Sequence, residues 1–174
     1  SASKIFWGGL RVGWLRADAV TVARLAAQRS RLDLAGPLLE QLAVLHLMRD
    51  LGAVRALRRD GLRRSRDTLA ALLREQLPSW RFRVPTGGQV LWCGLPAGAS
   101  STAVSAAAGD RGVRLTPGTR FAADGTLESW LRLPFTRSAD DLERVVPVLA
   151  QAWAASGGTA AETPADTDSD AFVV

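Results

Sequence analysis

The spacing of apolar residues changes character near residue 78. Before that point, leucine, valine and alanine recur every three or four residues, which is the period of an amphipathic helix. We predict helices over 19–29, 36–52 and 53–77, because Asp18 can cap the start of the first and Pro78 must end the last. The first half of the chain is therefore expected to be mainly helical.

The second half has a shorter rhythm. Segments of strand length alternate or run apolar, and turn signals such as "PTGG" separate them. Ser100 or Ser101 can open one small helix, and Ser138 can cap a final amphipathic helix that Pro147 is expected to kink or break. The expected strands are 11–17, 80–84, 88–95, 113–118 and 129–135, and the expected helices of this half are 100–112 and 138–155. From residue 78 the order is β-β-α-β-β-α, so the fold class is α/β.

The C-terminal segment 155–174 differs in composition from the rest. It contains Glu162, Asp166, Asp168 and Asp170 and no lysine or arginine. Small residues dominate it, and they cannot bury enough apolar surface to offset the entropy of ordering the chain. We predict a disordered acidic tail that carries a charge of −4, so the residues before it, with 22 basic and 13 acidic side chains, carry +9, which gives the net charge of +5.

The composition excludes several classes of protein. One cysteine, Cys93, cannot form an intramolecular disulfide and is expected to be a buried thiol in a reducing compartment. With one histidine and scattered carboxylates, we expect no metal site. No apolar run reaches the roughly 18 residues of a membrane span, so a cytoplasmic protein is expected. The start at Ser1 indicates a piece of a longer chain.

Lys4, in the opening run "SASKIFWGGLRVGW", is the one lysine among 22 basic residues. A lysine amine can lose its proton and form an imine with a carbonyl, whereas a guanidinium stays charged. Ser1 and Ser3 lie just before it, and Arg11 follows a two-glycine turn. Hydroxyls and a planar guanidinium near one amine suit a phosphorylated aldehyde. Chance is the alternative explanation for one surviving lysine.

This run resembles the lysine motif of fold-type-I pyridoxal-phosphate enzymes, the aspartate-aminotransferase superfamily of class I and II, and most closely the version in MocR-type regulators of the GntR family. The resemblance implies that Lys4 is the catalytic Schiff-base lysine of pyridoxal 5'-phosphate. It implies that Ser1 and Arg11 hold the cofactor phosphate and that Ser3 belongs to the same cofactor-binding set.

Later motifs follow the family in the same order through residue 154. "GAVRALRRDGLRRSRDTLAALL" resembles its long helix, "PTGGQVLWCGLP" and "RGVRLTPGTRF" resemble parts of its small domain, and "LRLPF" is similar to the strand whose arginine binds a substrate carboxylate. The resemblance of "LRLPF" implies that Arg132 binds the carboxylate of an amino acid. The implied domains are the end of the large cofactor domain (1–31), interdomain helices (32–77), the small α/β domain (78–154) and the tail (155–174).

Three functions remain open at this stage. The sequence "FWGGLRVGW" and the arginine-rich helix favour the cofactor- or effector-sensing domain of a MocR-type regulator. Such a regulator would bind DNA only through a missing N-terminal domain. The alternative is a standalone amino-acid aminotransferase, and the remote alternative is nucleic-acid binding through the arginine-rich helix itself. The resemblance also implies a homodimer and an amino-acid or amine ligand. Because the family's other cofactor contacts precede the lysine, we expect the 174-residue piece alone to be inactive.

Overall fold

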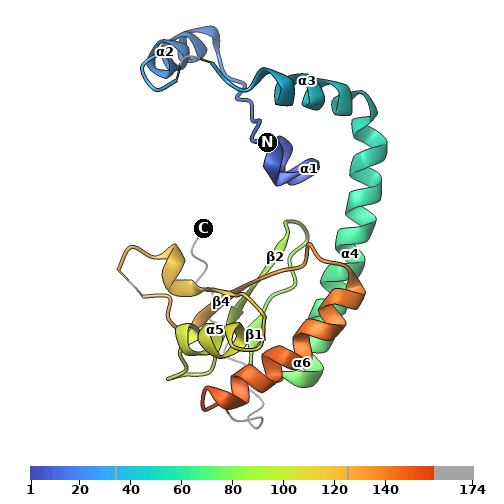
Figure 1. Ribbon diagram of the computed structural model, residues 1–174, viewed down its shortest axis with the longest axis vertical. Coiled ribbons are helices and arrows are strands. Elements are labelled where there is room, and N and C mark those ends of the chain that lie inside the picture. Colours follow the sequence, from blue (N-terminus) through green and yellow to red (C-terminus); the bar gives the residue numbers. More distant parts are fainter. Residues whose placement is uncertain (34, 125, 159–174) are drawn as a thin grey trace. The chain divides into compact units, whose positions relative to one another are not determined.

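The computed structural model describes residues 1–33, 35–124 and 126–158 (Figure 1). The chain divides into two compact units, Ser1–Asp60 and Gly61–Val174, each with its own buried cluster. The α/β class expected from the sequence is confirmed, because helices make up the first unit and the second combines helices with a sheet. Within the described ranges, no helix is long and apolar enough to cross a membrane.

Unit 1 consists of short helices. They are α1 (Ala2–Ile5), η1 (Gly8–Leu10), α2 (Ala19–Arg29), α3 (Leu38–Leu47) and η2 (Met48–Asp50), followed by the start of α4 (Leu51–Gln76). Asp18 caps α2 as predicted: its carboxylate accepts a hydrogen bond of 2.9 Å from the Thr21 amide. The hydrogen bond from the Thr21 hydroxyl and, second, this bond from its amide lower the pKa of Asp18.

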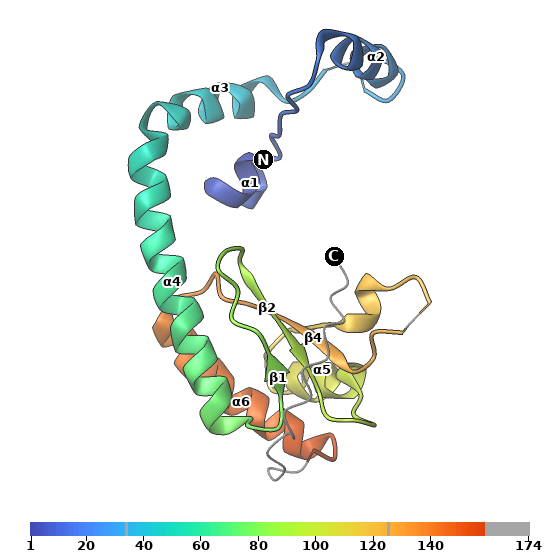
Figure 2. The ribbon, with the colours of Figure 1, turned by 180° about the vertical axis from the view of Figure 1, so that it is seen from behind.

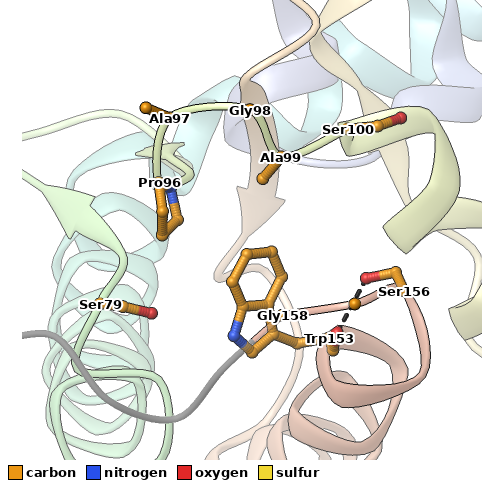
Figure 3. A pocket seen from close by; sticks show the side chains of 10 residues that line it. Ser79, Pro96, Ala97, Gly98, Ala99, Ser100, Trp153, Ser156 and Gly158 are labelled. Atoms are coloured by element: carbon orange, nitrogen blue, oxygen red, sulfur yellow. Dashed lines mark hydrogen bonds between the residues drawn. The ribbon is translucent and has the colours of Figure 1, made fainter.

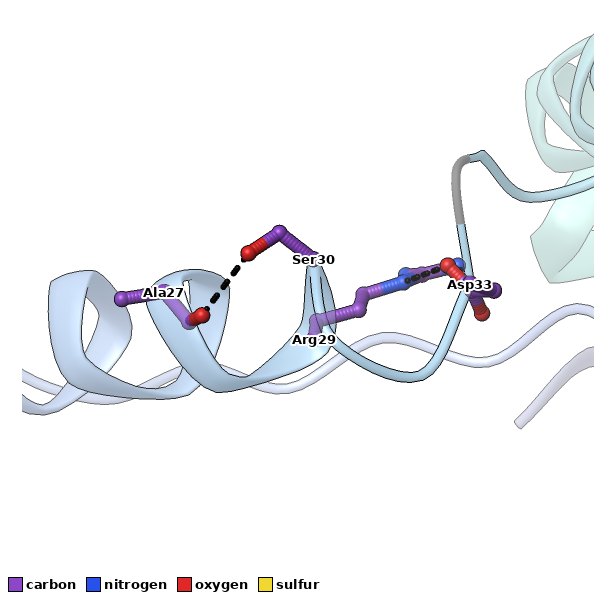
Figure 4. A network of polar contacts seen from close by, with 4 residues as sticks. All are labelled: Ala27, Arg29, Ser30 and Asp33. Atoms are coloured by element: carbon purple, nitrogen blue, oxygen red, sulfur yellow. Dashed lines mark hydrogen bonds and ion pairs between the residues drawn. The ribbon is translucent and has the colours of Figure 1, made fainter.

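The end of α2 is held by local polar contacts, which Figure 4 shows. The Ser30 hydroxyl donates to the carbonyl oxygen of Ala27 at 2.9 Å, and Arg29 Nε lies 3.1 Å from Asp33 Oδ1. Arg29 and Asp33 are half exposed, so the ion pair contributes little stability, at most about 1 kcal/mol. These contacts end the helix without help from other elements.

The predicted strand over 11–17 is wrong: these residues have no regular secondary structure. A strand needs a second strand for its backbone groups, and the described part of unit 1 contains none. The carbonyl oxygen of Val12 instead accepts a hydrogen bond from the Ala2 amide at 2.9 Å. The segment therefore serves to close a loop.

Helix α4 runs unbroken from Leu51 to Gln76, so Gly61 does not interrupt it. In unit 2 its buried face presents Leu69 and Leu73, one turn apart, to the core. The arginines of its exposed side, Arg55, Arg58, Arg59, Arg63 and Arg64, all face solvent. The helix is thus amphipathic where it enters the core.

Unit 2 contains a four-stranded antiparallel sheet in the order β1-β2-β4-β3. The strands are β1 (Arg81–Phe82), β2 (Val90–Gly94), β3 (Thr116–Pro117) and β4 (Trp130–Pro134), and the helices are α5 (Ser101–Gly109) and α6 (Ala139–Ala155), with η3 (Gly118–Phe121) after β3. The predicted β-β-α-β-β-α order is confirmed. Figures 1 and 2, which view the chain from opposite sides, both show α5 and α6 beside the sheet.

Alternate residues of the two central strands face the helices. Leu91 and Cys93 of β2 and Leu131 and Leu133 of β4 are buried with residues of α4, α5 and α6. Cys93 is a buried thiol, as expected, and its burial raises its pKa to about 12. The residues between them face the other side of the sheet and are only half buried.

Helix α6 continues through Pro147 and ends at Ala155, where the predicted tail begins. The amides of Ser156, Gly157 and Gly158 return to carbonyls of the last turn, so these residues cap the helix. The remainder of the predicted tail, 159–174, lies outside the described residues.

Candidate functional site

The residues from Ser1 to Val12 form one small loop. The hydrogen bond from the Ala2 amide to Val12 closes it, and Ala2 and Leu10 are buried with Val44 of α3. Phe6 and Val12 pack against the same cluster. Ser1 and Arg11, the predicted phosphate ligands, are each the neighbour of a residue in the closing bond. The loop therefore brings the predicted cofactor residues of the motif together.

Lys4 lies in the single turn of α1, between these two ends of the loop. Its side chain is exposed, as is Ser1, and Ser3 is half buried. The turn presents the amine at the surface of unit 1, while Ala2 beneath it is fully buried. The buried Ala2 fixes the backbone of α1, from which the Lys4 side chain extends to the surface.

Arg11 adopts an unusual backbone conformation. Its φ of 50° and ψ of 23° are left-handed, and it is the one non-glycine residue of the described ranges with a positive φ. Residues other than glycine rarely adopt this backbone conformation, and those that do are often found at ligand-binding positions. One guanidinium nitrogen donates to the carbonyl oxygen of Gly8 at 3.3 Å. The remaining donors of the exposed group are available for a phosphate.

An aromatic ring lies over one glycine of the turn before Arg11. Trp7 folds over Gly9 so closely that a Cβ atom there would overlap its indole ring. Trp7 itself is 69% exposed. A side chain at Gly9 would therefore have to displace this exposed ring, whereas a Cβ atom at Gly8 would meet no described atom within 4 Å.

Arg132 lies in β4 of unit 2, on the half-buried face of the sheet. It is paired with Trp92 of β2 and Thr116 of β3, and its Cζ atom lies 6.0 Å from the ring centroid of Phe121. Among the residues that the structure describes, no carboxylate forms an ion pair with it. The donors of its planar guanidinium are thus not occupied by a carboxylate of the described chain.

Sequence reasoning did not identify the aromatic residues around Arg132. Trp92 and Trp130 are stacked, with centroids 5.8 Å apart and an interplanar angle of 10°, and Phe121 meets Trp92 edge to face at 5.6 Å. The alternation along the two strands places Trp92, Trp130 and Arg132 on one face. The strand register and the fold of η3 were needed to add Phe121.

A separate cavity of about 310 Å³ lies in unit 2, and none of the predicted site residues lines it. Figure 3 shows its walls: the loop Pro96–Ser100, the Trp153 ring and the end of α6. The buried hydroxyl of Ser79 points into it and has no hydrogen-bond partner among the described residues. Small side chains and backbone form most of its lining.

The donor set of the motif loop fits a phosphorylated aldehyde. It combines one amine, two hydroxyls and a guanidinium, which supply a covalent attachment point and charge-assisted donors for a phosphate. The strained backbone of Arg11 is the structural observation that points the same way.

The comparisons with known proteins identify the class. The model of the aminotransferase class I and II family matches residues 1–149, so the chain belongs to that family. The 2-aminoadipate transaminase of Thermus thermophilus is 32% identical over 140 residues, which are 78% of this chain and 34% of that protein.

Solved structures agree. An α-aminoadipate aminotransferase of Thermus thermophilus, complexed with N-(5'-phosphopyridoxyl)-L-leucine, has a TM-score of 0.79 at 27% identity and covers 89% of this chain and 41% of its own. The N-succinyldiaminopimelate aminotransferase of Mycobacterium tuberculosis has a TM-score of 0.74 at 28% identity and covers 87% and 40%. The family and the first complex indicate pyridoxal phosphate as the cofactor. The chain spans about a third of the length of the curated relative.

Proposed function

We propose that this chain is the C-terminal part of a pyridoxal-phosphate-dependent amino-acid aminotransferase. Lys4 binds the cofactor aldehyde through its amine, and Ser1, Ser3 and Arg11 hold the cofactor phosphate. The observation that carries the proposal is the closed loop in which the only lysine lies between Ser1 and a left-handed Arg11. Nothing but a lysine can supply the covalent attachment.

Each residue then has a distinct task. The cofactor, when bound, supplies an electron sink for cleavage of the Cα–H bond of an amino acid. The Lys4 amine, once displaced by the substrate, would take the Cα proton as a general base and would return it, as a general acid, to the former aldehyde carbon of the cofactor, which is the 1,3-proton shift of transamination. Arg132 binds the α-carboxylate with two parallel hydrogen bonds and so orients the Cα–H.

The relatives favour an aminotransferase over the regulator. Those described above are enzymes, and they include a 2-aminoadipate transaminase and an N-succinyldiaminopimelate aminotransferase. A sensing domain of a MocR-type regulator keeps the same lysine and carboxylate chemistry, so the site residues serve both hypotheses. A DNA-binding domain preceding residue 1 in the full-length protein is what distinguishes the regulator.

We further propose a homodimer, as in the family, and the division of the chain at residues 31, 77 and 154. The exposed apolar residues of α3 support a larger assembly, since Leu38, Leu39 and Leu45 are each more than 60% exposed. Sedimentation of the full-length protein tests this proposal, and a monomer at micromolar concentration contradicts it.

The test of function uses the full-length protein loaded with pyridoxal phosphate. We expect borohydride reduction to fix the pyridoxyl group on Lys4 and on no other residue, as read by peptide mass spectrometry. Lys4→Arg keeps the charge and should abolish both the labelling and turnover.

A panel of amino donors tests the substrate class. L-2-aminoadipate, LL-diaminopimelate, L-tyrosine and L-alanine are each mixed with the loaded protein and a 2-oxo acid as the amino acceptor, and formation of the new amino acid is followed. Turnover of at least one donor is expected. Labelling at another residue, or no turnover of any donor, contradicts the proposal.

A further inference from the structure

The guanidinium of Arg132 is contacted by an aromatic ring rather than by an acid. Its Cζ atom lies 6.0 Å from the centroid of Phe121, within the range of a cation–π interaction. Phe121 meets Trp92 edge to face, and Trp92 stacks on Trp130. We call Phe121, Trp92 and Trp130 the aromatic row.

The sheet register builds this row. Trp92 is paired with Arg132, and Gly94, two residues further along β2, is paired with Trp130. A Cβ atom at Gly94 would lie 3.3 Å from the Trp130 ring, so the missing side chain lets that ring lie close over β2. Trp130 therefore reaches the ring of Trp92 across the strands.

Phe121 is the last residue of η3, which follows β3 directly. Gly118 starts this turn where a Cβ atom would overlap the backbone oxygen of Leu127. The Gly118 amide also donates to the buried hydroxyl of Ser101 at 3.3 Å. The turn is thus fixed at its base, while the Phe121 ring at its end is 51% exposed.

An aromatic neighbour suits an arginine that must bind an anion. A carboxylate partner would occupy the guanidinium donors and compete with the substrate, whereas the face of a ring attracts the cation and accepts none of its in-plane hydrogen bonds. Holding the side chain in advance also reduces the rotamer entropy that is lost when the anion binds.

We propose that Phe121 is a positioning residue for Arg132: its ring holds the guanidinium with the planar fork open to the substrate α-carboxylate, and Trp92, which is stacked on Trp130, holds the Phe121 ring. This inference rests on the proposed carboxylate-binding role of Arg132. It assigns the aromatic row to the affinity for the carboxylate rather than to the chemical step.

The test uses Phe121→Leu in the full-length, cofactor-loaded protein. The probes are the panel amino acid with the highest kcat/KM and the amine that lacks its α-carboxylate. We expect KM for the amino acid to rise about two- to fivefold, the effect of a lost exposed cation–π contact, with kcat nearly constant. KM for the amine should not change. Phe121→Tyr, which keeps the ring, should restore the original KM.

The chain offers a matched control. Arg74 lies over the ring of Phe82, with its Cζ atom 5.5 Å from the centroid, in the same unit. Phe82→Leu removes a cation–π contact of the same kind and is expected to leave KM for the amino acid unchanged. Urea unfolding of each variant establishes that it is folded under the assay conditions.

Arg132→Gln distinguishes the proposed carboxylate-binding role of Arg132 from the positioning role of Phe121. It should raise KM more than Phe121→Leu does, and Phe121→Leu should add nothing in the Arg132→Gln background. If Arg132→Gln leaves KM unchanged, the proposed carboxylate site is wrong. If Arg132→Gln raises KM but Phe121→Leu does not, or if Phe121→Leu raises KM for the amine equally, the positioning role is wrong.

Discussion

Arg11 meets two demands that oppose each other. Its backbone is left-handed, a conformation that costs a residue with a Cβ atom about 1–2 kcal/mol and costs glycine almost nothing. Glycine would therefore suit the backbone better. The presence of arginine at this position is explained only by a function of its side chain. Its single described hydrogen bond, to the Gly8 carbonyl oxygen at 3.3 Å, is exposed and weak. We infer that the guanidinium is kept for a ligand.

Arg11→Gly should separate stability from binding. We expect the free energy of unfolding to stay within about 1 kcal/mol of the original protein, while the affinity for pyridoxal phosphate falls about tenfold or more, because hydrogen bonds to a charged group are lost. Absorbance titration and urea unfolding of the full-length protein measure the two quantities. Arg16→Gly, which removes an exposed charge nearby, is the control. Unchanged cofactor affinity in Arg11→Gly would refute the phosphate role.

At the scale of elements, the sequence predicted most of the structure. Capping residues located α2, α5 and α6 almost to the residue, since Asp18, Ser100 and Ser138 each accept a hydrogen bond from the first turn of the following helix. The strand over 11–17 was wrong, because its apolar pattern says nothing about the presence of a partner strand. Local signals place helices well, whereas a strand depends on residues distant in the sequence.

The start of α5 depends on a side chain from a distant segment. Glu128 accepts hydrogen bonds from the Ser100 hydroxyl, from the Thr102 amide at 3.1 Å and from the Thr102 hydroxyl at 2.9 Å. The hydrogen bond from Ser100 is the main cause of the lowered pKa of Glu128. The ionised carboxylate thus satisfies donors of the first turn that the helix itself leaves open.

This lowered pKa makes the stability of unit 2 sensitive to acid. A carboxyl group with a lower pKa in the folded state stabilises the fold above its usual pKa of 4.5, and that contribution disappears as the pH falls through the lowered value. We expect Glu128→Gln to unfold at lower urea concentration than the original protein at neutral pH, with the difference shrinking as the pH falls below 4.5 and through the lowered pKa. Glu143→Gln, an exposed change on α6, is the control. A pH-independent difference would contradict the prediction.

For the whole molecule, the sequence predicted the family and the order of its motifs but not which residues would surround them. The loop of Lys4 followed from a local motif with its two glycines. The aromatic row around Arg132 depends on the register of β2 against β4 and on η3, which are set by packing between segments far apart in the chain. The roles of Ser1, Ser3, Lys4, Arg11 and Arg132 stay predictions until they are tested.

The two units differ greatly in the cores that they bury. The larger cluster, from Leu69 to Trp153, lies wholly in unit 2 and joins α4, the sheet, α5 and α6. Unit 1 buries only Ala2, Leu10 and Val44 as its cluster among the described residues. Cooperative unfolding requires a core that can offset the entropy of ordering the chain, and only unit 2 has one of that size.

We therefore expect the fragment of residues 61–158 to fold alone and to unfold in one cooperative transition. The fragment of residues 1–60 should lose its helical signal gradually with urea, without a sigmoidal transition. Circular dichroism at 222 nm measures both, and the 174-residue chain should show one main transition at the midpoint of fragment 61–158. A cooperative transition in fragment 1–60 would show that its small cluster suffices. A main transition of the whole chain well above that of fragment 61–158 would show that unit 1 stabilises unit 2, which the separate cores do not predict.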